Sequence, residues 1–295
     1  MLSGYRVRRR CMNAFHAAVR GSAGFLRLLL PLEIRKALVV RIEQLKFRWG
    51  ADFSLGILAD LRRHNPEALH RFLWSNHLAY AATYEVEKRF AASNLNPTRQ
   101  ILFGQIVDYY RRCALNPREQ IRSVLEIGCS LGYLLRHLEL YTFPDAAPLH
   151  GLDIDRHAVQ TGMSYLQSVN SKVRLFEADV TRVGNVAGNQ LYDLALCCGV
   201  LMYVNKETAK ATLQKIFAVS RRLVGIICLA HDERRRTVPN SEIRKSDGAY
   251  LHDMHRMIEE VGGRLISSTF VNAAASGSSP SHVILAEPPA LAGRT

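Results

Sequence analysis

The hydrophobic positions of this chain follow two different patterns, and the change between them falls near residue 122. Before that point, apolar residues recur at three- and four-residue spacing, which predicts helices; one such set is Leu38, Ile42, Leu45 and Trp49. After it, short apolar runs alternate with helical stretches. This alternation indicates an α/β layered fold with a mainly parallel sheet.

Three Asn-Pro pairs, at 65–66, 96–97 and 116–117, divide the first part of the chain. A residue before proline is disfavoured in a helix, so each pair predicts that one helix stops and another starts. The predicted helices cover residues 55–61, 68–82, 84–92 and 97–112.

Seven strands are predicted in the second part. They cover residues 123–127, 149–153, 173–178, 192–197, 224–230, 264–271 and 282–286. In an open α/β sheet, ligands bind at the carboxyl ends of the strands. Chemistry-bearing residues are therefore expected directly after the strands.

Charge separates the same two parts of the chain. The net charge is +13, and residues 1–122 hold 21 Lys and Arg against 9 Asp and Glu, whereas residues 123–295 hold 18 against 17. Apolar and charged fractions of 48% and 22% are those of a globular protein. The basic surplus thus belongs to the helical part and points to two functional regions.

Residues 1–32 contain six arginines and no acidic residue. Three interpretations stay open: a helical extension packed on its own domain, a peripheral helix at an anionic membrane, or a mitochondrial presequence. The pattern continues past Pro31 without a break, which disfavours the presequence. No run of 18 apolar residues occurs, so no membrane-spanning helix is expected. We expect a cytoplasmic protein whose residues 1–48 can contact the inner face of a membrane.

The six cysteines form no C-x-x-C pair, which disfavours a zinc site, and two of them lie in predicted buried strands, which suits a reducing compartment. No metal is expected. No nucleic-acid-binding motif is visible either, so the basic charge alone does not establish nucleic-acid binding.

The most informative stretch is LEIGCSLGYLL, residues 125–135, which ends the first predicted strand. Gly128 and Gly132 would let the backbone turn sharply and approach a ligand closely. The second strand ends in GLDID, residues 151–155, where Asp153 is placed to accept hydrogen bonds from both ribose hydroxyls of a nucleoside. Asp155 is interpreted as a helix N-cap.

Two further motifs follow in order: FEADV at 176–180 and YDLALCCGVLMYV at 192–204. As an ordered set, the four motifs resemble those of the class I S-adenosylmethionine-dependent methyltransferases. The resemblance implies a seven-stranded Rossmann-like sheet whose last two strands form an antiparallel hairpin. Together with the charge and the helical pattern, it leads us to expect three regions: a basic amphipathic segment (1–50), a helical substrate-side region (51–122) and the methyltransferase domain (123–290).

Ser130 helps to choose between two nucleotides. A dinucleotide-binding loop usually reads G-x-G-x-x-G, and its middle glycine lets the backbone approach a pyrophosphate. Ser130 occupies that middle position here. S-adenosylmethionine has no pyrophosphate, so the loop favours this ligand over NAD(P).

The resemblance also implies roles for individual residues. Those at the methionine end of the donor would be Glu126, Gly128, Ser130 and Gly132. Asp153 would hold the ribose and Ile154 would pack on the adenine. Asp179 and the Val180 amide would bind the adenine edge, and Cys198 and Gly199 would lie beneath the reacting methyl group. Asp193 is interpreted as a structural acid at the start of its strand.

Candidates for proton transfer are His231, which follows the fifth strand, and Tyr203, just beyond the fourth. His252 and His255 are interpreted as structural. The run Arg234–Arg236 is either a solvated charge cluster or a feature that favours an anionic acceptor.

The chain lacks both the Asn/Asp-Pro-Pro-Tyr/Phe motif and the Pro-Cys motif, which disfavours methylation of nucleic-acid bases. We expect O-methylation of a small molecule or of a saccharide of a surface polymer. Two alternatives stay open: an RNA or protein methyltransferase that uses the basic part as its grip, and a non-catalytic adaptor with this fold.

Overall fold

The computed structural model describes residues 30–44, 51–79, 85–91, 94–231, 241–277 and 279–289, without the side chains of residues 51 and 52. Expectations about the arginines before residue 30 and about Arg234–Arg236 lie outside these residues. The chain forms two compact units, residues 1–78 and 79–295, which are treated separately below. No helix within the described residues is both long and apolar enough to cross a membrane.

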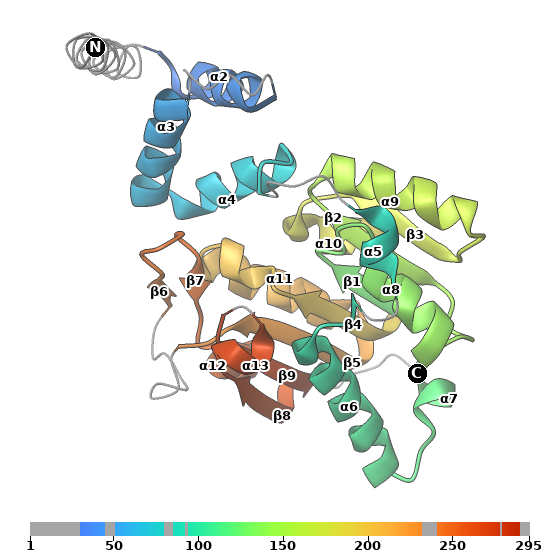
Figure 1. Ribbon diagram of the computed structural model, residues 1–295. Coiled ribbons are helices and arrows are strands. Elements are labelled where there is room, and N and C mark those ends of the chain that lie inside the picture. The colour runs from blue at the N-terminus through green and yellow to red at the C-terminus, as the bar shows by residue number, and fades with distance from the viewer. Residues whose placement is uncertain are drawn as a thin grey trace, which may run out of the picture. The chain divides into compact units, whose positions relative to one another are not determined.

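The first unit contains helices α2 (Leu32–Gln44), α3 (Ala51–His64) and α4 (Pro66–Ser75), shown in blue in Figure 1. Their buried contacts form a small separate core of Val39, Ile57, Leu61, Leu69 and Phe72. The prediction that a helix covers 68–82 is wrong for residues 76–79, and residues 80–82 lie outside the described residues. The Asn76 side chain donates to the Phe72 carbonyl (2.9 Å), and His77 has a φ of 56°, so the helix cannot continue.

The Asn-Pro pairs start helices as predicted. The second unit begins with α5 (Val86–Phe90), α6 (Pro97–Arg112) and α7 (Pro117–Gln120). Asn65, Asn96 and Asn116 each accept a hydrogen bond from a backbone N–H in the first turn of α4, α6 and α7, at 2.9, 3.1 and 3.1 Å. Proline follows each asparagine at the first helical position, where its missing N–H is tolerated.

A seven-stranded sheet forms the centre of the second unit, with the order β3-β2-β1-β4-β5-β9-β8. Its strands are β1 (Val124–Ile127), β2 (Leu149–Asp153), β3 (Val173–Glu177), β4 (Tyr192–Cys198), β5 (Ser220–Leu229), β8 (Arg264–Val271) and β9 (Ser281–Glu287). Neighbours among β1 to β5 pair in parallel, whereas β9 is antiparallel to both β5 and β8. This confirms the predicted sheet with its antiparallel last pair.

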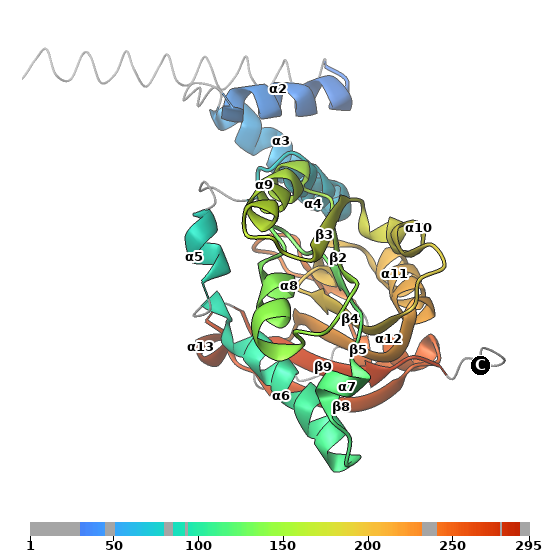
Figure 2. The same cartoon turned by 90° about the vertical axis from the view of Figure 1, so that its right-hand side faces the viewer.

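Helices cover both faces of the sheet, as Figure 2 shows. One face packs against α6, α8 (Tyr133–His137) and α9 (Arg156–Ser168), and the other against α10 (Val183–Ala187), α11 (Lys206–Ala218) and α12 (Met254–Glu260). Buried residues of these helices and of the strands form two cores, one on each face of the sheet. A short helix, α13 (Ala273–Ser276), connects β8 to β9.

The prediction for the fifth strand was too short. It begins at Ser220 rather than Val224, and the added residues include Arg221 and Arg222, two half-exposed charged residues that interact with Asp193. A small hairpin was not predicted at all: β6 (Glu242–Ile243) pairs with β7 (Tyr250–Leu251) between β5 and α12. Strands of two residues are too short to show an alternating pattern.

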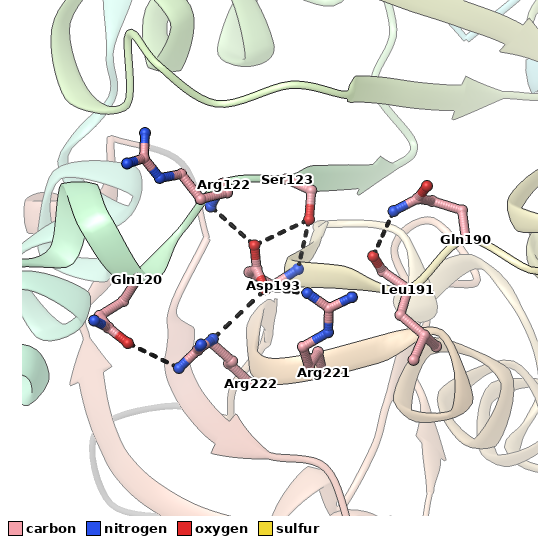
Figure 3. A network of polar contacts seen from close by, with 8 residues as sticks. All are labelled: Gln120, Arg122, Ser123, Gln190, Leu191, Asp193, Arg221 and Arg222. Atoms are coloured by element: carbon pink, nitrogen blue, oxygen red, sulfur yellow. Dashed lines mark hydrogen bonds and ion pairs between the residues drawn. The ribbon is translucent and has the colours of Figure 1, made fainter. Parts of the chain in front are cut away.

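Asp193 organises the amino-terminal edge of the sheet (Figure 3). Its Oδ2 accepts hydrogen bonds from the Arg122 N–H (2.9 Å) and the Ser123 hydroxyl (3.1 Å). Its Oδ1 lies 3.2 Å from Arg221 Nη1 and 3.5 Å from Arg222 Nε. Asp193 thus ties β4 to the start of β1 and to β5, at the edge opposite to the expected ligand site.

Candidate active site

A tight turn follows β1 at the carboxyl edge of the sheet. Gly128, Ser130 and Gly132 have φ angles of 74°, 50° and 79°, in the left-handed region that glycine tolerates best. A Cβ on Gly128 would lie 2.1 Å from Val200 Cγ2, so only glycine fits there. Ser130 adopts the same backbone region with a side chain, which makes it the strained member of the turn.

Asp153, at the end of β2, holds this turn in place. Its Oδ2 accepts from the Ser130 N–H at 2.7 Å, and its Oδ1 accepts from the Asp155 N–H at 2.9 Å. Burial raises the pKa of Asp153, while these backbone hydrogen bonds act against that rise. Asp155 itself caps α9 by accepting from the Ala158 N–H (3.0 Å), which confirms its interpretation as an N-cap.

Glu126 is a buried acid whose surroundings leave one oxygen unused. The residue is only 3% exposed, and its Oε2 accepts no hydrogen bond from the described residues. Burial raises the pKa of Glu126 to about 8; Arg99 acts against the rise and Asp153 adds to it. A buried polar atom without a partner is rare and calls for a ligand or a proton.

Arg99 is a site residue that the sequence did not reveal. It lies in the first turn of α6, where Asn96 caps its backbone N–H, and its guanidinium is 5.5 Å from the centre of the Tyr133 ring at the start of α8. Its charge lowers the pKa values of both Glu126 and Cys198, which places it beside the carboxyl edge. The only local signal was the Asn-Pro helix start, which gives the position of α6 along the chain but not its place against the sheet.

A cavity of about 340 Å³ adjoins these groups. Residues from the start of α6, the ends of β4 and β5, the turn after β4, the β6–β7 connection and the start of β9 line it: Asn96, Thr98, Arg99, Cys198, Gly199, Met202, Tyr203, Ile227, Cys228, Leu229, Arg244, Ser279 and Ser281. A Cβ on Gly199 would meet no atom within 4 Å, so space is open directly at the end of β4. The lining is mixed apolar and polar, as in sites for small molecules.

The structure brings most of the predicted site residues to this edge. Glu126, Gly128, Ser130, Asp153 and the following Ile154 lie at the ends of the adjacent strands β1 and β2. Cys198, Gly199 and Tyr203 belong to the cavity wall.

Asp179 follows β3 and caps a short turn, where its Oδ1 accepts from the Thr181 N–H (2.9 Å) and hydroxyl (2.8 Å). Val180, the next residue, is the first of that turn. The adenine-binding role of this pair stays a prediction.

His231 does not line the cavity. Its Nε2 lies 3.5 Å from a carboxylate oxygen of Glu242, at the start of the β6–β7 hairpin. The two residues that follow it in the sequence, Asp232 and Glu233, lie outside the described residues.

His252 is structural, as expected, although it precedes α12 rather than lying within it. It is buried, and its ring lies between Ser241 and the carbonyls of Leu201 and Val204. His255 is in α12, and its Nε2 lies 2.8 Å from the Ser268 hydroxyl.

Comparison with known proteins agrees with this geometry. Residues 124–222 match the family model described as a methyltransferase domain. One similar solved structure is the O-methyltransferase from the trans-AT PKS multienzyme of Brevibacillus brevis in complex with S-adenosyl-L-homocysteine, with 14% identity over 74% of this chain and 79% of that chain and a TM-score of 0.50. No curated protein matches the chain.

Two other solved structures are similar at lower TM-scores. The magnesium protoporphyrin IX methyltransferase from Synechocystis PCC 6803 with bound SAM has 15% identity, covers 78% of this chain and 95% of its own, and has a TM-score of 0.46. The N-methyltransferase NodS from Bradyrhizobium japonicum WM9 with S-adenosyl-l-homocysteine has 14% identity, covers 69% and 96%, and has a TM-score of 0.46.

Residues 124–222 thus match a methyltransferase domain, and the seven-stranded sheet has the fold of the class I S-adenosylmethionine-dependent methyltransferases. This confirms the resemblance inferred from the four sequence motifs.

Proposed function

We propose that the chain binds S-adenosylmethionine at the carboxyl ends of β1, β2 and β4 and transfers its methyl group to an oxygen of a small molecule held in the cavity. The observation that carries the proposal is the position of the cavity. Cys198 and Gly199 line it. The charges of Glu126 and Arg99 shift the pKa of Cys198, which means that these groups lie close to it. The cavity therefore adjoins the glycine turn.

The chain's own groups fit the donor. The unpartnered Oε2 of Glu126 is suited to accept from the ammonium group, and the guanidinium of Arg99 is suited to bind the carboxylate. Asp153 would hold the ribose, with Ile154, Asp179 and Val180 around the adenine. Gly128 and Gly132 let the turn pack tightly, since a Cβ on Gly132 would lie 2.8 Å from Leu175 Cδ2.

The bound donor supplies an electrophilic methyl group. The protein then has to hold an acceptor in line with it, and positioning of this kind is worth roughly 7–11 kcal/mol of barrier. An oxygen acceptor must also lose a proton. Of the two candidates, Tyr203 lines the cavity whereas His231 does not. We assign Tyr203 the hydrogen bond to the acceptor hydroxyl.

The size of the cavity supports a small acceptor. Its volume of about 340 Å³ lies at the lower end of the range for ligand pockets. A small molecule or a single sugar unit would fill it. Apart from the size of the cavity, no observation supports a link to a surface polysaccharide.

Calorimetric titration tests the donor step. S-adenosylmethionine should bind with measurable heat and should be displaced by S-adenosylhomocysteine; no heat and no competition would leave only the adaptor alternative. Incubation with donor carrying a tritiated methyl group, against small-molecule, RNA and protein fractions of an extract, then tests the acceptor. Label confined to the RNA or protein fraction would contradict a small-molecule acceptor.

A further inference from the structure

The β6–β7 hairpin lies between β5 and α12 in the chain and brings one arginine, Arg244, to the cavity. Arg244 directly follows β6, its backbone N–H donates to the Ala249 carbonyl at 2.7 Å, and the Gly248 N–H donates back to the Arg244 carbonyl at 2.8 Å. Gly248 has a φ of 82°, which lets the chain turn back tightly. The hairpin therefore fixes the backbone of the residue whose side chain lines the cavity.

The guanidinium of Arg244 is itself held at a fixed orientation. Nε donates to Asp247 Oδ1 (2.9 Å), Nη2 donates to Asp247 Oδ2, and Nη1 donates to the Ser279 hydroxyl (2.9 Å). An arginine has five N–H donors in one plane, so two of them remain for a ligand after these three bonds. A guanidinium oriented in advance loses less entropy when it binds an oxyanion through two hydrogen bonds.

His252 fixes the hairpin to the opposite wall of the cavity. Its Nε2 lies 3.0 and 3.1 Å from the carbonyls of Leu201 and Val204, which flank Met202 and Tyr203. Carbonyls only accept, so Nε2 carries the hydrogen and Nδ1 accepts from the Ser241 hydroxyl at 2.8 Å. His252, which directly follows β7, thereby bonds the hairpin that carries Arg244 to the turn that carries Tyr203.

Of the described residues that line the cavity, the charged ones are Arg99 and Arg244, and none is acidic. Glu126 lies nearby, but burial raises its pKa to about 8, so it adds little negative charge at neutral pH. Arg99 stands beside Glu126 at the donor end, which leaves Arg244 to face the acceptor.

We propose that Arg244, together with the Ser279 hydroxyl, binds a carboxylate or phosphate group of the methyl acceptor. The acceptor is then an anionic small molecule, and Arg244 is the residue that selects it. This inference rests on the proposed function, because it assigns the cavity to the acceptor. It depends on residues other than those that hold the donor.

The test uses the full chain saturated with S-adenosylhomocysteine and three probes: benzoate, its uncharged analogue benzamide, and inorganic phosphate. Benzoate and benzamide have nearly the same size and shape, so a difference between them reports the charge. We expect benzoate or phosphate to bind and benzamide to bind at least tenfold more weakly. Which of the two anions binds more tightly identifies the acceptor group as a carboxylate or a phosphate.

Arg244→Met should weaken anion binding about tenfold or more, as expected for the loss of two charge-assisted hydrogen bonds. Arg244→Lys, which keeps the charge but not the planar fork, should recover part of the affinity. Arg256→Met is the matched control, since Arg256 is an exposed arginine on α12 paired with Glu260, away from the cavity; it should bind the anions as the wild type does. Unchanged affinity for S-adenosylhomocysteine in all three variants shows that each is folded.

Equal binding of benzoate and benzamide, no binding of either anion, or full anion affinity in Arg244→Met would each overturn the inference. If the donor binds, these outcomes reject only the role of Arg244 and do not contradict the proposed function. Absence of donor binding in the wild type would instead reject the proposed function itself.

Discussion

Two buried carboxyl groups lie on adjacent strands of the sheet and have opposite surroundings. Asp193, at the start of β4, is 2% exposed and accepts from a backbone N–H and a hydroxyl while facing two arginines. Glu126, within β1, is 3% exposed and has an oxygen without a hydrogen-bond partner among the described residues. The two carboxyl groups are therefore similarly buried. The described residues supply hydrogen-bond partners to both oxygens of Asp193 at one edge of the sheet, but leave one oxygen of Glu126 without a partner toward the other edge.

The difference separates a structural acid from a binding acid. A buried charge that the protein satisfies itself stabilises the fold and has little capacity left for a ligand. A buried carboxyl that lacks some of its hydrogen-bond partners destabilises the free protein. Binding of a cationic group supplies the missing partner and is therefore favourable. Each prediction below tests this contrast, beginning with the largest expected effect.

Asp193→Ala should lower the free energy of unfolding by about 3 kcal/mol, because the Ser123 hydroxyl and the Arg122 N–H lose a buried acceptor. Urea denaturation measures this loss. The exposed Asp145→Ala should change stability by less than about 0.5 kcal/mol. Folded Asp193→Ala should still bind S-adenosylhomocysteine within about twofold of the wild type. A loss of affinity with intact stability would reverse the assignment.

Asp153→Ala should weaken binding of S-adenosylhomocysteine by at least about tenfold, since the substitution removes the proposed ribose contact and releases the Ser130 N–H that orders the glycine turn. Calorimetry at constant pH measures the change, again with Asp145→Ala as the control. Near-wild-type affinity would show that the end of β2 does not bind the donor.

Glu126→Gln should have opposite effects on stability and on binding. The folded protein raises the pKa of Glu126 from 4.5 to about 8. The wild type therefore loses stability as the pH rises from 4.5 to about 8, because the unfolded chain releases this proton first. Thermal melting of the free variant should be higher than that of the wild type at pH 8.5 and nearly equal at pH 5.

The same variant should bind S-adenosylhomocysteine about tenfold more weakly, because the neutral amide replaces the acceptor of the ligand's ammonium group. At pH 7, ligand binding to the wild type should also release a proton, seen as a dependence of the binding heat on the ionisation enthalpy of the buffer. Proton release that persists in Glu126→Gln would assign the proton to another group.

Ser130→Gly should have the smallest effect. Ser130 has a φ of 50°, so glycine should stabilise the protein by about 1 kcal/mol at most. Affinity for S-adenosylhomocysteine should stay within about twofold, because the backbone N–H that donates to Asp153 is kept. A loss of affinity beyond that range would show that the Ser130 side chain contacts the donor.

The four motifs were recognisable in the sequence because of where their residues lie. Each of the four motifs consists of a strand and the residues directly after it, so one local pattern gives both the element and its place at the carboxyl edge. The Asn-Pro helix starts were predictable for a similar reason, since a cap depends on residues two or three positions apart.

Arg99 and Arg244 could not be found in this way. Arg99 belongs to a helix that precedes the sheet, and Arg244 to a hairpin of two-residue strands that shows no alternation. His231 had the right position in the sequence, directly after β5, but lies beside Glu242 rather than on the cavity wall. Position along the chain alone does not show which of these residues reach the cavity, because the loops leave the edge of the sheet in different directions.

The sequence by itself determined the class of fold, the strands, the glycine turn and the acids beside it, because each depends on neighbours within a few residues. Only the tertiary structure decided which charges face the cavity and which acid keeps an unused oxygen. Those properties depend on contacts between segments far apart in the chain, and burial changes the charge and hydrogen bonding of a side chain without any change in its local sequence.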